Sequence, residues 1–190
     1  AIGLEYDLIS PGKYLTHAKT VNKNKKLNFK EVVDIDKKKL NKFSKNYVSK
    51  AFKNLDEALN YSNYEFIIVS VPTKNIYEVF QKLRGHKSIK HILLEKPGAD
   101  NFNKFQDIYK FCQRKGINLL LNYNRSYLSL FTKELLFLKK TKYFKIIHIY
   151  SRGLKTNASH FLNLLFQNLS LPKKIDILRV KKIISSDNEV

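Results

Sequence analysis

Two apolar runs, each closed by a proline, decide the fold. Residues 65–72 are Glu-Phe-Ile-Ile-Val-Ser-Val-Pro, and residues 91–97 are His-Ile-Leu-Leu-Glu-Lys-Pro. Short apolar runs of this kind are typical of strands that are buried on both faces of a parallel sheet. Pro72 and Pro97 have no backbone N–H to give to a sheet, so we expect strands at residues 65–71 and 91–95 that the prolines close.

Segments of helical and extended character alternate around these two strands. Further strands are predicted at residues 1–3, 29–34 and 117–121. Asn101 is the expected N-cap of the last helix in this series, and Gly116 is expected to stop it. The predicted helices span residues 37–45, 55–59, 76–83 and 102–115. This alternation with short connections predicts an α/β fold, with a parallel sheet covered by helices on both faces.

The pattern changes after residue 123. Two apolar helices and two strands without matching crossovers are predicted there, at residues 128–138, 158–169, 144–150 and 175–180. We therefore expect a nucleotide-binding domain at residues 1–123 and the start of an α+β second domain at residues 124–190. The chain has no Met and opens inside a predicted strand, so we expect it to be an incomplete form of a longer protein.

Composition argues against several classes of protein. The formal net charge is +20, but most of the positive side chains are Lys, spread along the chain. Specific nucleic-acid recognition relies more on Arg, so we expect no specific nucleic-acid partner and only salt-sensitive binding to polyanions. No apolar run approaches the length of a membrane helix. Cys112 is the single cysteine, which favours a reducing cytoplasm.

Polar residues follow the predicted strands where ligands of such a sheet bind, beyond the carboxyl ends. An acid at the end of the second strand can bind the two ribose hydroxyls of adenosine and repels a 2′-phosphate, so Asp34 favours NAD over NADP. Asp36 is the competing candidate, and either one could be an ordinary turn aspartate. Only Gly3 is left of the glycine-rich loop that usually holds a pyrophosphate.

Two side chains are candidates for the chemistry itself. Lys96 follows the tip of an apolar strand, where its ammonium could donate a hydrogen bond to a substrate oxygen that gains charge. His160 lies near the start of an apolar helix and could exchange a proton near neutral pH. The competing interpretations are a solvated turn lysine and a histidine buried in a core. No cluster of residues has metal-ligand spacing, and none of the other four histidines has a setting like that of His160.

These residues, in this order, resemble the glucose–fructose oxidoreductase / inositol dehydrogenase (Gfo/Idh/MocA) family. The most specific element is Leu-Glu-Lys-Pro at residues 94–97. Support comes from Val-Pro-Thr at residues 71–73, from Asn-Tyr-Asn-Arg at residues 122–125, and from residues 157–160. The resemblance implies a Rossmann domain with a doubly wound sheet, followed by a domain that commonly forms homo-oligomers.

The chemistry that the resemblance implies is hydride transfer between a nicotinamide and a secondary alcohol of a sugar, cyclitol or nucleotide sugar. Lys96 would contact the substrate hydroxyl, and His160 would be the acid/base. The cofactor-binding residues that the resemblance suggests are Gly3, Asp34, Val71, Pro72, Glu95 and Asn124.

The sequence also departs from the family pattern. Asp34 comes 31 residues after Gly3, where about 20 is usual. Thr156 replaces an Asp that is common one turn before the catalytic histidine, with Asn157 beside it. These departures keep a second hypothesis open, in which the protein is a non-catalytic homologue that binds a nucleotide or sugar and regulates.

Overall fold

The computed structural model describes residues 16–47, 50–128, 133 and 154–168. The chain divides into two compact units, residues 1–122 and residues 123–190. The predicted first strand at residues 1–3 lies outside the described residues, as do the predicted elements at 128–138 (apart from Leu128 and Lys133), 144–150 and 175–180.

The strands of the first unit are all parallel to their neighbours. They are β1 (Glu31–Val33), β2 (Lys50–Phe52), β3 (Phe66–Val69), β4 (His91–Glu95) and β5 (Asn118–Asn122). Among the described residues, β1 pairs with β2, and a second sheet has the order β3-β4-β5. In that sheet Val69 lies beside Leu94, and Glu95 beside Asn122, so the carboxyl ends of all three strands meet at one edge.

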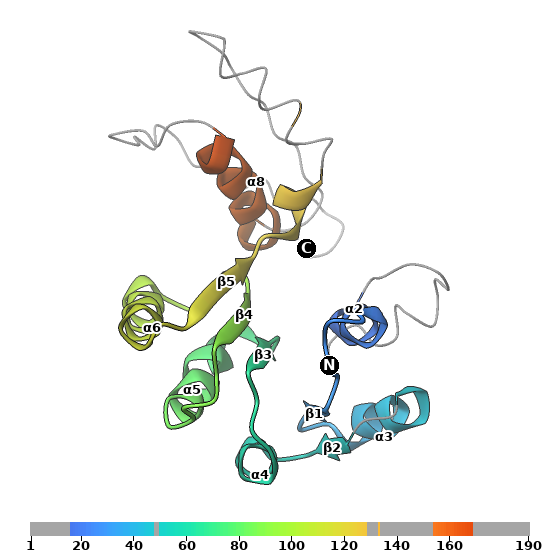
Figure 1. Ribbon diagram of the computed structural model, residues 1–190. Coiled ribbons are helices and arrows are strands. Elements are labelled where there is room, and N and C mark those ends of the chain that lie inside the picture. The colour runs from blue at the N-terminus through green and yellow to red at the C-terminus, as the bar shows by residue number, and fades with distance from the viewer. Residues whose placement is uncertain (1–15, 48–49, 129–132, 134–153, 169–190) are drawn as a thin grey trace, which may run out of the picture. The chain divides into compact units, whose positions relative to one another are not determined.

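Helices connect these strands and lie on both sides of them (Figure 1). The helices of this unit are α2 (His17–Lys23), α3 (Lys37–Asn46), α4 (Leu55–Tyr61), α5 (Thr73–Leu83) and α6 (Phe102–Lys115). In Figure 1, α5 and α6 lie on one side of the strands, whereas α2 and α3 lie on the other. The predicted α/β fold of parallel strands alternating with helices is therefore confirmed.

The ends of the helices follow from local hydrogen bonds. The Asn101 side chain accepts from the backbone N–H of Lys104 and caps α6, as predicted. Gly116 ends the same helix in the left-handed region, with φ of 65°, which a residue without Cβ adopts at little cost. The Asp36 side chain caps α3 by accepting from the backbone N–H groups of Lys38 and Lys39.

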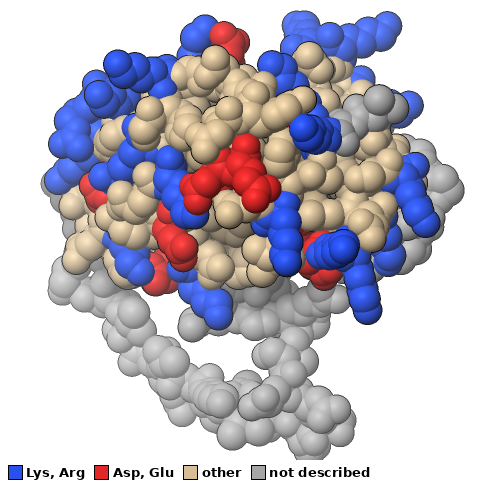
Figure 2. All heavy atoms as spheres, turned by 90° about the horizontal axis from the view of Figure 1, so that it is seen from below, with Lys and Arg blue, Asp and Glu red and all other residues tan. Residues whose placement is uncertain are grey.

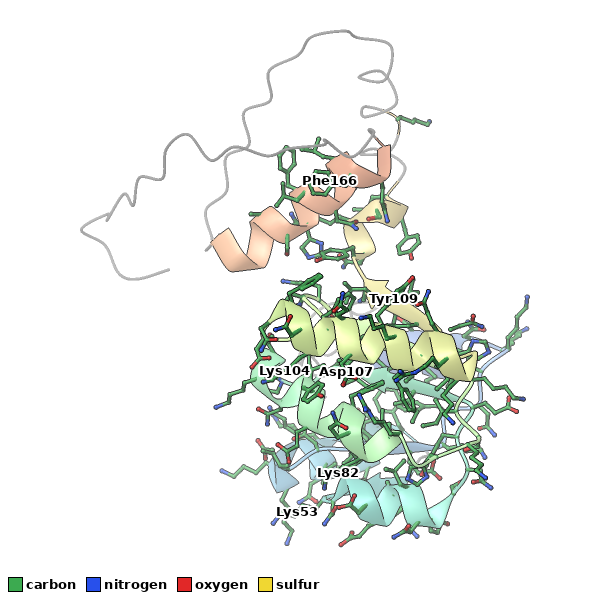
Figure 3. All side chains as sticks on the ribbon, turned by 90° about the vertical axis from the view of Figure 1, so that its left-hand side faces the viewer. Lys53, Lys82, Lys104, Asp107, Tyr109 and Phe166 are labelled. Carbon is green, nitrogen blue, oxygen red and sulfur yellow. The ribbon has the colours of Figure 1, made fainter. Side chains whose placement is uncertain are left out.

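The core of the first unit lies between the β3-β4-β5 sheet and the helices α5 and α6. Ile92 and Leu94 point into it from β4, and Phe80 and Ile108 meet them from the helices. At the rim, the Asp107 carboxylate on α6 accepts a hydrogen bond from the hydroxyl of Tyr77 on α5 at 2.7 Å. It also forms an ion pair with Arg84, the C-cap residue of α5. Figure 3 shows Asp107 and Lys104 on the side of α6 next to α5.

The elements β2 and α5 differ from the sequence-based expectation. The strand β2 was not predicted, because Lys-Ala-Phe is too short and too polar to form an apolar run. The helix α5 begins at Thr73 rather than at residue 76, because Pro72 stands at its N-cap and proline fits the start of a helix. The strand β4 has the predicted bounds.

The described part of the second unit is a short pair of helices. A 3-10 helix, η1, spans Asn124–Tyr127, and α8 spans Leu154–Asn168, beginning four residues before the helix that the sequence predicted. The Ser126 hydroxyl donates a hydrogen bond to the Asn163 side chain at 2.5 Å, which ties η1 to α8.

Candidate functional site

A cluster of hydrogen-bonded polar side chains lies at the carboxyl ends of β4 and β5. The Glu95 oxygen Oε1 lies 2.6 Å from His17 Nε2 and accepts a hydrogen bond from Asn122 Nδ2, also at 2.6 Å. These partners come from α2 and β5, so three elements meet on one carboxylate. The arrangement fixes the side chain immediately before Lys96.

The electrostatics of Glu95 reflect two opposing effects. Partial burial raises the pKa of the Glu95 carboxyl, because the charged form loses water. The hydrogen bonds from His17 and Asn122 act in the opposite direction and prevail, so its pKa lies below the usual value of 4.5. Glu95 is therefore a carboxylate at neutral pH and holds its donors by charge-assisted hydrogen bonds.

The turn after Glu95 is held by the backbone and by close packing. The Gly98 N–H donates to the Glu95 carbonyl at 3.0 Å, and the Lys96–Pro97 peptide bond is cis. Gly98 has φ of 92°, and a Cβ there would lie 2.7 Å from the Phe105 ring on α6. Lys96 is partly buried and follows β4 directly, so the strand end and the helix together place it.

The end of β3 lies at the same sheet edge. Val71 and Pro72 follow the strand two and three residues after Val69, which pairs with Leu94. The Val71 side chain packs against the core, whereas Pro72 is exposed. The register therefore brings Val71, Pro72, Glu95 and Lys96 to one edge of the sheet.

The two aspartates after β1 have different settings. Asp36 caps α3, so its place in the sequence has a structural cause. Asp34 Oδ1 accepts the backbone N–H of Asp36 at 2.9 Å, and the Asp34 N–H donates to the Phe52 carbonyl on β2. Between them Ile35 is 82% exposed. A carboxylate at a strand end beside an exposed apolar side chain fits a ribose with its base, so Asp34 is the better candidate.

The remaining predicted site residues belong elsewhere. Gly3 lies outside the described residues. Asn124 is exposed at the start of η1 in the second unit. His160, in the same unit, is buried on α8, with the Tyr123 ring edge-on to its imidazole at a centroid distance of 5.5 Å.

Sequence reasoning missed His17 as a functional candidate. Its sequence neighbourhood indicates no particular setting, whereas in the structure it contacts Glu95. The two residues are 78 positions apart, so no local pattern joins them. The one available signal was the Thr16 N-cap, whose side chain accepts from Lys19 N–H and starts α2 with His17.

Two features are absent from the described residues. No group of three or more His, Cys, Asp or Glu side chains in them could hold a metal ion. Over the same part of the chain, no helix has the length and apolar character to cross a membrane.

Comparison with known proteins agrees with the geometry of the first unit. The model of the Gfo/Idh/MocA group, described as an oxidoreductase family with an NAD-binding Rossmann fold, matches residues 12–123. The chain belongs to this oxidoreductase family. The match includes the ends of β1, β3 and β4, where Asp34, Pro72 and Lys96 lie.

Individual members of the family resemble shorter parts of the chain. An uncharacterised oxidoreductase of Schizosaccharomyces pombe is 30% identical over 78 residues, which is 41% of this chain and 21% of that protein. This chain therefore spans about a fifth of the length of that relative.

Solved structures share the fold at lower identity. GenD2 from gentamicin A biosynthesis, in complex with NAD, has a TM-score of 0.69 at 16% identity, over 81% of this chain and 50% of that one. The WlbA dehydrogenase of Bordetella pertussis, in complex with NADH and UDP-GlcNAcA, has a TM-score of 0.59 at 17% identity, over 75% and 48% of the two chains. A myo-inositol 2-dehydrogenase of Lactobacillus plantarum has a TM-score of 0.59 at 20% identity, over 69% and 39%. The chain thus spans about half of these structures or less.

Proposed function

We propose that the protein is an NAD-dependent dehydrogenase that oxidises a secondary alcohol of a sugar, cyclitol or nucleotide sugar. The observation that carries the proposal is the anchored Glu95 carboxylate directly before Lys96, at the sheet edge where β3, β4 and β5 end. Ligands of such folds bind at this edge. Two proteins of similar fold, a myo-inositol 2-dehydrogenase and a dehydrogenase in complex with NADH and UDP-GlcNAcA, support the substrate class.

The residues of the first unit fit a dinucleotide. Asp34, at the end of β1, presents a carboxylate to ribose hydroxyls, and its charge disfavours a 2′-phosphate. Val71 and Pro72 follow β3 and would line the middle of the dinucleotide site. Lys37 and Lys38, at the start of α3, carry positive charge close in sequence to Asp34.

Each polar side chain has a distinct role in the proposed reaction. When bound, the nicotinamide accepts a hydride from the alcohol carbon. Lys96 donates a hydrogen bond to the substrate oxygen and stabilises the negative charge that develops there. His160 takes the hydroxyl proton and so acts as the general base of the oxidation. Glu95 holds the strand end from which Lys96 projects.

The proposal is tested by titrating the complete natural protein with NADH and with NADPH. Binding is measured by fluorescence and by calorimetry. We expect saturable binding with a preference for NADH, and reduction of NAD in the presence of a substrate from a panel of sugars, cyclitols and nucleotide sugars. Failure to bind either dinucleotide would overturn the proposal. Binding without turnover on any panel member would favour the regulatory homologue instead.

A matched pair of variants tests the role of Asp34. We expect Asp34→Ser to weaken NADH binding and to reduce the preference over NADPH. Asp36→Ser should leave binding unchanged, because serine also caps a helix. Equal effects of the two substitutions would contradict the assignment.

Two wider expectations remain predictions. We propose that the second domain of the complete protein mediates homo-oligomers. We also propose that the protein works in a reducing cytoplasm, where the single thiol of Cys112 stays reduced.

A further inference from the structure

The contact between His17 and Glu95 joins the first described helix to the strand that leads into Lys96. His17 is the first residue of α2, and Glu95 is the last residue of β4. Their side chains are 32% and 28% exposed, so the pair is partly withdrawn from water. Partial withdrawal strengthens such a contact relative to one on an open surface.

Both donors converge on the same oxygen of Glu95. His17 Nε2 approaches Oε1 from α2, and Asn122 Nδ2 approaches it from β5. With only one hydrogen bond, the carboxylate could still rotate about the bond that joins it to the rest of the side chain. Two short bonds from different elements fix both its position and its orientation.

The network continues to the backbone of the next residue. The backbone N–H of Lys96 also acts on the Glu95 carboxylate and contributes to lowering its pKa. The orientation of this carboxylate therefore affects the direction in which the chain leaves β4. A displacement of Glu95 would be transmitted to the Lys96 Cα and from there to its ammonium.

We propose that His17 is a positioning residue that acts through Glu95 and, together with Asn122, sets the place of Lys96. The importance of this role for catalysis rests on the proposed function. The effect of His17 on the position of Lys96 does not depend on the proposed function. His17 touches neither the substrate nor the cofactor in this role.

The opposite end of the same strand supplies a matched control. His91 opens β4, is exposed, and its Nδ1 lies 3.2 Å from Asn118 Nδ2 at the start of β5. It thus joins β4 to β5 at the edge away from Lys96, as the contact of Glu95 with Asn122 does at the other edge. A general effect of losing a histidine contact should arise equally from His91.

The experiment compares His17→Leu, His17→Gln and His91→Leu in the complete natural protein. Each variant is treated with a limiting amount of N-acetoxysuccinimide, and acetylation of Lys96 is measured by peptide mass spectrometry relative to Lys110, an exposed lysine on α6. Circular dichroism confirms that each variant is folded.

We expect His17→Leu to increase the rate of Lys96 acetylation by about threefold or more, since a hydrogen bond to a charged group is lost. His17→Gln should restore the wild-type rate, because its amide nitrogen can occupy the position of Nε2. His91→Leu should have no effect. An unchanged rate in folded His17→Leu, or an equal increase in His91→Leu, would overturn the proposal.

A second variant covers the case in which His17→Leu does not fold. His17→Asn keeps a polar side chain, but its shorter amide does not reach Glu95, so it should act as His17→Leu does. Acetylation requires neither NAD nor substrate. If the wild-type protein did not bind NADH, only the proposed function would be refuted. If the rate of Lys96 acetylation were unchanged in the His17 variants, only the role of His17 would be refuted.

Discussion

At the scale of single residues, Lys96 directly follows a carboxylate that two neighbouring elements hold in place. If Lys96 stabilises charge on the substrate oxygen, Lys96→Met should lower kcat by about 10²–10³-fold. The affinity for NADH should stay within about twofold, because the dinucleotide is held by other residues. Steady-state kinetics and fluorescence titration measure the two quantities.

Lys90 provides the control for that substitution. It precedes β4 at the opposite end and forms an exposed ion pair with Glu65 at 2.7 Å. Exposed pairs of this kind contribute little to stability, so Lys90→Met should leave both quantities unchanged. A Lys96→Met protein with wild-type kcat would contradict the catalytic assignment.

Glu95 gives the stability of the first unit a defined pH dependence. Its pKa is lowered in the folded state, despite burial, by the hydrogen bonds from His17 and Asn122. The folded protein therefore binds fewer protons than the unfolded one, so the stabilisation is present above the usual pKa of 4.5 and is lost as pH falls through the folded value.

We accordingly expect Glu95→Gln to lower the free energy of unfolding at pH 7 and to have little effect at pH 3. Urea denaturation of both proteins at the two pH values tests this expectation. The same loss at both values would mean that the Glu95 charge is not what stabilises the contact.

At the scale of elements, Gly98 is the point where the end of β4 meets α6. Its φ of 92° and the 2.7 Å approach of a Cβ to the Phe105 ring both oppose any larger residue. Gly98→Ala should therefore lower the free energy of unfolding by about 2–3 kcal/mol, from backbone strain and overpacking together. Chemical denaturation measures the loss.

Two other glycines separate those causes. Gly116 has φ of 65° but open space around it, so Gly116→Ala should cost only about 1 kcal/mol. Gly85 has neither a positive φ nor a neighbour within 4 Å, so Gly85→Ala should cost nothing. If Gly98→Ala were no worse than Gly116→Ala, the packing against Phe105 would not matter.

Local sequence predicted some elements better than others, for physical reasons. The strand β4 was predicted to the residue because its apolar run is long enough and Pro97 ends it. The strand β2 was missed because its three residues are held by pairing with β1 rather than by their own pattern. Strand propensity is informative only where the residues of the strand themselves determine its structure.

The candidate site shows the same division. Lys96 could be chosen from its place after an apolar strand, and Asp34 from its place after β1. The contact of His17 with Glu95 could not be chosen, because it depends on how α2 is placed against β4. That Asp36 caps α3 also emerged only from the hydrogen bonds of the structure.

At the scale of the whole molecule, the positive charge is distributed rather than gathered. Figure 2 shows Lys and Arg side chains over much of the visible face, with Asp and Glu side chains between them. With a formal net charge of +20, the protein should bind heparin, but its affinity should fall at least about tenfold between about 50 and about 200 mM salt.

Competition experiments decide whether that binding is specific. Unrelated double-stranded DNA sequences should compete equally at every salt concentration. A sequence that retained a marked advantage at physiological salt would show that the charge serves nucleic-acid recognition.

The burial of Cys112 makes its sulfur a natural reporter of how often the first unit opens. The side chain is 1% exposed and lies in the core with Phe80 and Ile108, and burial raises the pKa of its thiol to about 11. Since the thiolate is the reactive form, a thiol-specific reagent should label Cys112 only in molecules that have transiently opened. The rate of labelling by DTNB under native conditions should then rise with urea and fall when NADH is added, which measures the coupling of cofactor binding to the stability of the fold.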